Sequence, residues 1–130
     1  MGEEFSGTAP IYYQIAQKIC GQIVRGEVLP GDKLPSVREL AVQFGVNPNT
    51  VQRVYMELEL MGVSEARRGQ GTFVTEDRER LKQLRERLKM EKIESFAADM
   101  KALGFTESEI ANGLQLFMTG KSNEGGEADG

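Results

Sequence analysis

The stretch GVNPNTVQRVYMELELMG, residues 45–62, decides the fold. Asn47 and Pro48 place a preferred N-cap residue directly before a proline, a combination that begins many helices. Apolar side chains then recur at helical spacing, at Val51, Val54, Tyr55, Leu58 and Met61. Polar side chains gather at the front of the same segment, at Asn47, Asn49, Thr50, Gln52 and Arg53. The pattern predicts a helix that ends at Gly62, with an apolar back and a polar N-terminal face.

A second helix is predicted directly before it, in the segment SVRELAVQFG of residues 36–45. Ser36 and Glu39 have the S-x-x-E spacing of a capping box. The apolar face has helical spacing and consists of Val37, Leu40, Ala41 and Phe44. Gly45 ends this helix, so about three residues join the two helices. That spacing is typical of a helix-turn-helix.

A third helix and a β-ribbon flank this pair. Isoleucine recurs every fourth residue at Ile11, Ile15, Ile19 and Ile23, which predicts a helix between Pro10 and Gly26. The segment VLPGDKLP, residues 28–35, predicts a turn because it holds two prolines and a glycine. The segment VSEARRGQGTFV, residues 63–74, has strand-forming residues at its ends and glycines at its centre. Three helices and a two-stranded ribbon with a basic tip predict a winged helix-turn-helix.

The polar front of the helix over residues 48–61 has the side chains for reading DNA. Asn and Gln can bond adenine in the major groove and Arg can bond guanine, while free N–H groups at a helix start favour phosphate. Basic residues of the segment 33–74 gather near the helix starts and the ribbon tip: Lys33, Arg38, Arg53, Arg67 and Arg68. Glu57 and Glu59 lie toward the other end of the helix. We therefore expect a basic face on a chain with a net charge of −4.

The composition excludes several classes of function. The 130 residues include one cysteine and no histidine, which excludes an internal disulfide and argues against a Cys/His zinc site or a histidine-based catalytic centre. No motif pairs a nucleophile with a base, so we expect neither an enzyme nor a cofactor. The longest apolar runs fall far short of the roughly 20 residues of a membrane span. The start of the chain lacks a signal-peptide pattern, and a cytoplasmic protein without a membrane partner is expected.

The segment after the ribbon predicts two charged helices. From Glu76 to about Leu103 one apolar stripe contains Leu81, Leu84 and Leu88, and another contains Ile93, Phe96, Ala97, Met100 and Leu103. The two stripes are rotated by roughly a third of a turn, so the two halves are expected to bury against different surfaces. A last helix begins at the capping box of Thr106 and Glu109. The expected regions are a flexible N-terminus (1–9), a winged helix-turn-helix (10–75), a helical dimerisation segment (76–119) and a disordered tail (120–130).

These motifs closely resemble the DNA-binding domain of the GntR family of bacterial transcription regulators. The resemblance covers residues 10–75 and rests on a long ordered set: LPGDKLPSVRELA, then TV in the second helix, then LELMG and finally RRGQGTFV. VNPNTV and the short helical tail are similar to the YtrA-type subfamily of small homodimeric repressors, whose C-terminal helices dimerise. Some members have an arginine at the position of Pro48, so their base preference does not carry over.

The resemblance implies that Arg38 contacts the DNA backbone or a base, that Arg68 and Gly69 approach the minor groove, and that four residues face the major groove: Asn49, Thr50, Gln52 and Arg53. With the pattern of the residues themselves, the predicted DNA contacts are Ser36, Arg38, Asn47, Asn49, Thr50, Gln52, Arg53, Arg67, Arg68, Gly69 and Gln70. The predicted dimerisation residues are Leu81, Leu84, Leu88, Ile93, Phe96, Met100, Leu103, Leu114 and Phe117. The tail is too short for the ligand-binding domains of larger members. A cleft at the dimer interface, and any small-molecule effector, are left open.

Simpler interpretations stand beside this one. Ser36 and Asn47 serve as helix caps whether or not they contact DNA, and Arg38 is equally well read as a solvated surface arginine. Winged helices also act as protein-interaction adaptors, so the fold alone does not define the function. Cys20 suggests a redox-responsive regulator, although its place beside Gly21 on an amphipathic helix predicts burial and low reactivity. The leading hypothesis is a homodimeric repressor that binds an inverted-repeat operator.

Overall fold

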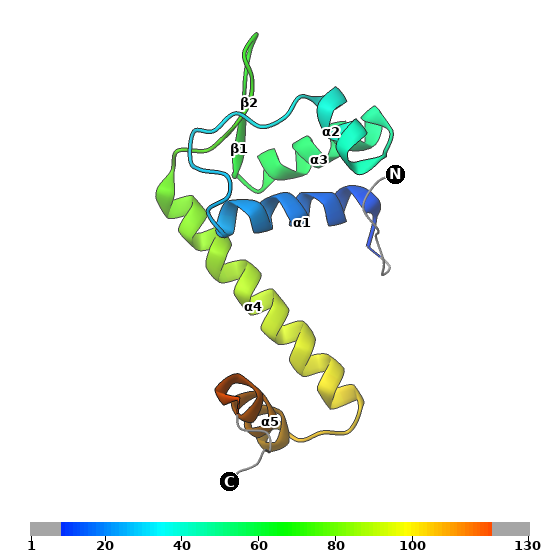
Figure 1. Cartoon of the computed structure of the whole chain (residues 1–130), viewed down its shortest axis with the longest axis vertical. Helices are drawn as coiled ribbons and strands as arrows, with labels where there is room; N and C mark the ends of the chain where they lie inside the picture. Colours follow the sequence, from blue (N-terminus) through cyan, green and yellow to red (C-terminus); the bar gives the residue numbers. More distant parts are fainter. Residues whose placement is uncertain (1–8, 121–130) are drawn as a thin grey trace. The chain divides into compact units, whose positions relative to one another are not determined.

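The computed structural model describes residues 9–120 (Figure 1). Within this range the chain is mainly helical with one small antiparallel sheet, as predicted. The elements are α1 (Ile11–Val24), α2 (Val37–Phe44), α3 (Pro48–Leu60), β1 (Ser64–Arg67), β2 (Gly71–Val74), α4 (Arg78–Ala102) and α5 (Glu107–Thr119). The contacts divide the chain between Glu86 and Arg87. We call residues 9–86 the N-terminal unit and residues 87–120 the C-terminal unit; α4 belongs to both.

The local signals at α2 and α3 form the caps that the sequence predicts. Ser36 Oγ accepts from the backbone N–H of Glu39 at 3.1 Å, and the Glu39 carboxylate accepts from the N–H of Ser36 at 2.8 Å. Gly45 ends α2 with φ of 67°, a left-handed conformation that glycine adopts without a Cβ penalty. Asn47 Oδ1 then accepts from the N–H of Asn49 at 2.7 Å and caps α3. Only residues 45–47 separate the two helices, which fixes the helix-turn-helix.

The wing is a two-stranded antiparallel ribbon with a three-residue tip. The strands pair Ser64 with Val74 at the base and Arg67 with Gly71 next to the tip. The segment of the predicted turn before α2 lies beside β2, because Lys33 forms an isolated antiparallel bridge with Phe73. Backbone hydrogen bonds also run from Gly31 N–H to the Val74 carbonyl and from Leu34 N–H to the Thr72 carbonyl, at 2.9 and 2.8 Å. The wing is therefore anchored to the segment that leads into α2.

The core of the N-terminal unit lies between α1, α2, α3 and the base of the wing. The fully buried side chains are Ile15, Ala16 and Cys20 on α1, Leu40 on α2, Val51, Val54 and Leu58 on α3, with Val63 and Val74 at the wing. Ile11, which was predicted on the same apolar face as Ile15, is 39% exposed because it lies at the start of α1. α3 packs against both other helices and against β1. The apolar back of α3 is buried by this packing, and its polar front remains at the surface.

The first turns of α4 belong to the N-terminal unit. Leu84 is only 2% exposed and Leu81 is half-buried. Arg85 donates to the Val24 carbonyl at 3.1 Å, which ties α4 to the end of α1. Leu84 was predicted at the dimer interface, but its side chain is already covered by its own chain and is not available to a partner. An apolar stripe on a helix does not indicate which surface covers it.

The C-terminal unit leaves most of its apolar side chains exposed. α5 begins at the predicted capping box, in which Thr106 Oγ1 accepts from the N–H of Glu109 at 3.1 Å. Ile110 is the buried side chain of α5. The exposed large apolar side chains of this unit are Met90, Ile93, Phe96, Leu103, Phe105, Leu114, Leu116, Phe117 and Met118. Within residues 9–120, no helix combines the length and the apolar character that crossing a membrane requires.

Candidate nucleic-acid interface

The N-terminal end of α3 presents its polar side chains to solvent. Asn47, Asn49, Gln52 and Arg53 are exposed, and Thr50 is half-buried. Asn47 uses its carbonyl oxygen for the cap and keeps its amide N–H₂ group for another acceptor. No acidic residue lies in the first turn of α3. This end of the helix therefore combines hydrogen-bonding side chains with the positive end of the helix dipole.

Arg53 does not extend freely from α3. Its guanidinium carbon lies 4.2 Å from the centre of the Tyr12 ring on α1, a cation–π distance. The stacking limits the directions in which the guanidinium can point and keeps it beside the polar front. Tyr12 is a residue that sequence reasoning missed, because no motif connects a residue of the first helix with one 41 positions later.

The start of α2 adds a second polar group to the same unit. Ser36 and Arg38 are exposed there, and Glu39 completes the capping box. Hydrogen bonds from the backbone and side chain of Ser36 hold the pKa of Glu39 below its ordinary value, so this carboxylate stays charged at neutral pH. Within residues 9–120, the Arg38 guanidinium has no carboxylate oxygen within 4.0 Å. A phosphate oxygen is the kind of partner that such an arginine takes.

Tyr55 joins the two helices at this surface. It lies on the buried side of α3 and its hydroxyl donates to the Pro35 carbonyl, directly before the start of α2. Burial, with a smaller contribution from the negative charge of Glu39, raises the pKa of Tyr55 to about 12. The hydroxyl therefore stays protonated, and remains a donor, throughout the neutral range.

The two arginines of the wing have different surroundings. The Arg67 guanidinium carbon lies 4.1 Å from the centre of the Phe73 ring, and Arg67 approaches Glu76 at 3.7 Å. Arg68, Gly69 and Gln70 form the exposed tip. In the described part of the chain, no carboxylate pairs with Arg68. The Arg68 guanidinium is therefore available to bind an anion, whereas the Arg67 guanidinium is held against the ribbon by Phe73 and Glu76.

Lys33 is a further basic group that the predicted site left out. The Lys33 bridge to Phe73 sets it beside the wing, and its Cε would lie 2.8 Å from a Cβ added at Gly71. Gly71 has φ of 121°, so it accommodates both the turn and the lysine stem. The sequence shows Lys33 as a basic residue in the segment PGDKLP, residues 30–35. Only the bridge to Phe73 shows that this residue lies beside the wing.

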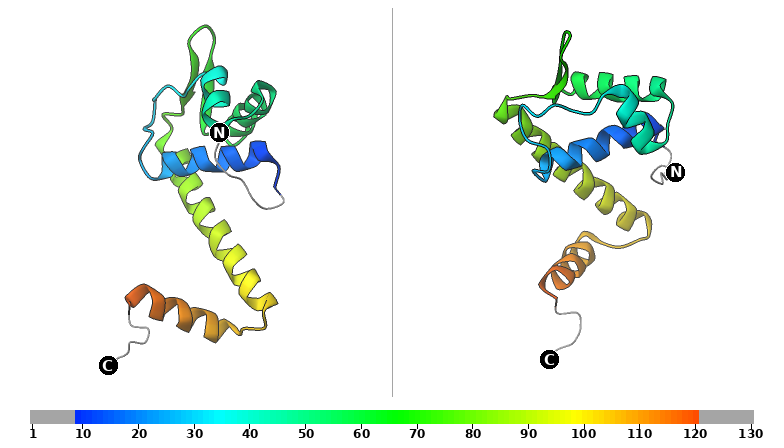
Figure 2. Two further views of the ribbon diagram at one scale, coloured as in Figure 1. Left: turned by 45° about the vertical axis from the view of Figure 1, so that its right-hand side comes forward. Right: turned by 45° about the horizontal axis from the view of Figure 1, so that its top comes forward.

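The predicted DNA-contacting residues belong to α2, α3, the residues just before these two helices, and the wing. Figure 1 shows α3 between α1 and α2, with the wing next to α3, and Figure 2 shows the same elements from two further sides. The glutamates of α3 lie in its later turns, at Glu57 and Glu59, away from the polar front. A rigid helix with an exposed polar front, next to a ribbon with a cationic tip, is suited to a DNA groove and the adjacent backbone.

This fold and this surface define a winged helix-turn-helix of the DNA-binding class. The family model described as "Bacterial regulatory proteins, gntR family" matches residues 11–74. The HTH-type transcriptional regulator YhcF of Bacillus subtilis is 50% identical over 120 residues, which cover 92% of this chain and 99% of that protein. The chain belongs to the gntR family and is a DNA-binding transcriptional regulator.

Other similar proteins agree with this identification. The HTH-type transcriptional repressor YtrA of Bacillus subtilis is 50% identical over 70 residues, 54% of each chain. A GntR family transcriptional regulator from Listeria monocytogenes has a structure with a TM-score of 0.77 and 40% identity, over 85% of this chain and 97% of that one. The DNA-binding domain of AraR, solved in complex with operator ORX1, has a TM-score of 0.52 and 34% identity, over 55% of this chain and 93% of that one.

The sequence also raised the question of redox, metal-binding and catalytic chemistry. Cys20 is fully buried in the core, so the thiol on which a redox-responsive regulator would depend is shielded from solvent. Among residues 9–120 there is no group of three or more Cys, Asp or Glu side chains that could hold a metal ion. The family and the similar proteins named above are regulators of transcription rather than enzymes.

Proposed function

We propose that the chain is a cytoplasmic, homodimeric repressor that binds an inverted-repeat operator. In this proposal the polar front of α3 reads bases in the major groove, and the wing tip and the start of α2 bind the backbone. The observation that carries it is the exposure of Asn49 and Gln52 at the start of α3, of Arg38 at the start of α2 and of Arg68 at the wing tip. The name of YtrA as a repressor and the AraR–operator complex support the same function here.

Base recognition is assigned to Asn49 and Gln52, with Arg53 beside them. Asparagine and glutamine can bond two atoms of adenine at once, and one such pair discriminates against a wrong base by roughly 1–3 kcal/mol. Arg38 and Arg68 are assigned to phosphates, since neither is neutralised by a neighbouring carboxylate in the described residues. Backbone contacts of this kind position the protein without selecting a sequence.

A matched pair of variants tests this assignment. Bound sequences are first selected from a random DNA pool, and the best operator is then titrated with Gln52→Ala and Gln43→Ala. Both glutamines are exposed, but Gln43 lies in the last turn of α2 rather than on the front of α3. Gln52→Ala should weaken operator binding by about 1–3 kcal/mol and relax base choice at one position per half-site. Equal effects of the two variants would contradict the assignment.

The same titrations separate the repressor from the adaptor alternative. A protein-interaction adaptor lacks affinity for DNA, whereas this proposal requires binding to genomic fragments at low salt that weakens as salt increases. A gel shift without any retarded DNA at low salt would favour the adaptor.

Dimerisation is assigned to the C-terminal unit. Leu103, Phe117 and Met118 are 74%, 77% and 73% exposed in the single chain. An accumulation of exposed large apolar side chains marks an interaction site, and a two-fold interface buries the same patch of both copies. The proposed interface residues are Leu88, Ile93, Phe96, Met100, Leu103, Leu114 and Phe117; Leu81 and the buried Leu84 belong to the N-terminal unit and are not among them.

Phe117→Glu and Leu60→Glu test the interface as a matched pair. Both side chains are largely exposed in the single chain, so neither substitution removes a packed side chain. Phe117→Glu should sediment as a monomer and lose operator affinity by a factor on the order of 10² or more, because the second half-site is no longer bound intramolecularly. Leu60→Glu should remain a dimer. A Phe117→Glu protein that is dimeric at the same concentration would move the interface elsewhere.

Operator symmetry gives an independent test of the dimer. A rigid two-fold protein fixes the distance between its half-sites, so inserting half a helical turn at the operator centre should abolish tight binding. Unchanged binding to the lengthened operator would contradict a rigid symmetric dimer.

A further inference from the structure

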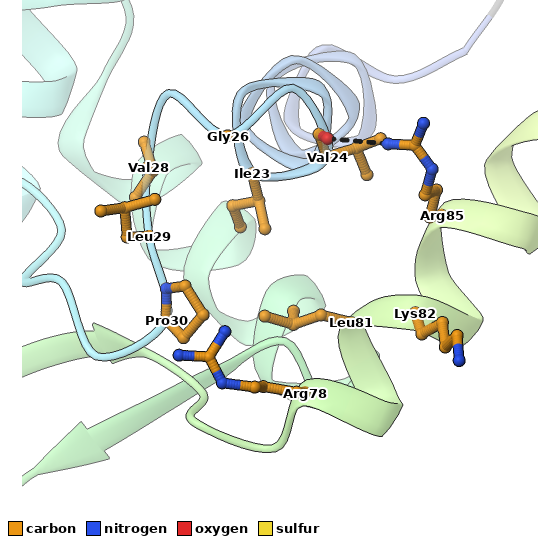
Figure 3. A pocket seen from close by; sticks show the side chains of 10 residues that line it. All are labelled: Ile23, Val24, Gly26, Val28, Leu29, Pro30, Arg78, Leu81, Lys82 and Arg85. Carbon is orange, nitrogen blue, oxygen red and sulfur yellow. Dashed lines mark hydrogen bonds between the residues drawn. The ribbon is translucent and has the colours of Figure 1, made fainter.

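A hollow of about 310 Å³ opens in the N-terminal unit (Figure 3). Its walls are the end of α1, the loop of residues 26–30 and the first two turns of α4. The apolar lining residues are Ile23, Val24, Val28, Leu29, Pro30 and Leu81. Figure 3 shows Ile23 and Leu81 extending toward the same open space, with Leu29 and Pro30 on its loop side. This volume is at the lower end of the range of small-molecule sites.

The apolar lining of this hollow is left open to solvent. Leu29 is 54% exposed, although two neighbouring lining residues, Val28 and Pro30, are half-buried. An apolar group that covers such a surface removes it from water, which is favourable. The hollow therefore favours a ligand with an apolar body.

The charged lining of the hollow is entirely cationic. It consists of Arg78, Lys82 and Arg85, all on α4, and no carboxylate lines the hollow. Figure 3 shows the Arg78 guanidinium next to Pro30 at the edge of the hollow, while the Lys82 side chain points away from it. Among the described residues, neither Arg78 nor Lys82 has a carboxylate oxygen within 4.0 Å. Arg78 is thus a cation at the mouth of an apolar hollow without an anionic partner.

Side chains already occupy the two helix ends at the hollow. Arg85 donates to the Val24 carbonyl at 3.1 Å, so it offsets the negative end of α1 where that helix meets the hollow. At the start of α4, the Asp77 carboxylate accepts from the N–H of Arg80 at 3.1 Å, and Glu79 lies in the first turn. The attraction for an anion therefore comes from the Arg78 side chain rather than from the helix end.

We propose that this hollow binds a small amphiphilic anion, a short alkyl or similarly apolar body that ends in a carboxylate or a phosphate. The apolar body lies on Leu29, Pro30 and Leu81, and the anionic group takes a charge-assisted hydrogen bond from Arg78. The ligand acts as an effector, because it bridges the loop of residues 26–30 and α4, and α4 continues past Glu86 into the unit assigned to dimerisation. This effector role depends on the proposed function, whereas the binding site does not.

Titration of the full chain in the absence of DNA tests the site directly. The probes are octanoate and octyl phosphate, with octyltrimethylammonium and acetate as controls for charge alone and for the missing apolar body. Isothermal titration calorimetry, with NMR shifts of the Leu29 and Leu81 methyl groups, should detect saturable binding of at least one octyl anion. Neither control should bind in the same range. Absence of saturable binding by both anions, or equal binding of octyltrimethylammonium, would overturn the proposal.

Arg78→Gln and Arg87→Gln provide a matched pair of variants. Both arginines are exposed on α4, but Arg87 lies outside the hollow and pairs with Glu91 at 3.8 Å. Arg78→Gln should weaken the octyl anion about tenfold, whereas Arg87→Gln should leave its affinity unchanged. Because both side chains are exposed, thermal melts should show that both variants are folded. An equal loss of affinity in the two variants would overturn the assignment to Arg78.

Operator titrations with and without saturating octyl anion test the effector role. The operator affinity should change by the same factor by which DNA changes the affinity for the anion. An unchanged operator affinity would overturn the effector role while the binding site stands. A failure of the proposed function is distinguishable, because the protein without any ligand would then fail to bind its operator.

Discussion

Removing the Tyr55 hydroxyl tests how the two DNA-facing helices are held together. Tyr55 on α3 donates to the Pro35 carbonyl directly before α2, and its side chain is 9% exposed. Tyr55→Phe keeps the ring packed but leaves this carbonyl without its donor, which costs about 1–3 kcal/mol. For a domain of this size each kcal/mol lowers the melting temperature by about 4–8 °C. The loss is measurable by urea or thermal unfolding at pH 7–8.

The pH dependence of this effect has a defined sign. The pKa of Tyr55 is raised to about 12 in the folded protein, against an ordinary value of 10.0 that applies to the unfolded chain. The stabilisation is therefore complete below pH 10 and is lost as the pH rises from 10 to 12, because the unfolded state ionises first. The loss amounts to about 2–3 kcal/mol at most. The stability gap between the wild type and Tyr55→Phe should shrink over this range.

Tyr13→Phe is the matched control. Tyr13 is half-buried, and its hydroxyl has no hydrogen-bond partner among the described residues. Tyr13→Phe should change the free energy of unfolding by less than about 0.5 kcal/mol, as expected for a substitution away from specific contacts. Equal stability of Tyr55→Phe and the wild type at pH 8, or a gap that is the same at pH 8 and pH 11.5, would refute the reasoning.

Two further predictions concern the wing and the start of α4. Arg68→Ala should weaken good and poor DNA sites alike and lower the salt slope by about 1, as measured by binding titrations at several salt concentrations; a strong change in base preference would contradict its assignment to phosphate. In the monomeric Phe117→Glu background, Leu84→Ala should lower the free energy of unfolding by about 2–5 kcal/mol because its side chain is 2% exposed, whereas Leu103→Ala should lower it little because Leu103 is 74% exposed; urea unfolding measures both. Similar small losses in both would place Leu84 outside the core.

The local structure of this protein is encoded in short segments of its sequence. The caps at Ser36, Asn47 and Thr106 form as predicted, because each depends on residues within three positions of one another. The turn at Gly45 and the wing tip follow from positive-φ glycine. The exposed front and buried back of α3 follow from helical periodicity. These signals, with the long family motif, were sufficient for the fold and for the class of protein.

Only the tertiary structure decided which contacts join segments far apart in the chain. The stacking of Arg53 on Tyr12 and the bridge from Lys33 to Phe73 join residues 40 or more positions apart, and no local pattern encodes such pairs. Leu84 and Leu103 belong to similar apolar stripes, yet one is buried and the other is exposed. Helical spacing shows that a face is apolar but not what covers it. That depends on where the chain brings its other elements, so the sequence determined the helices, and the packing determined which of their faces remain open to a partner.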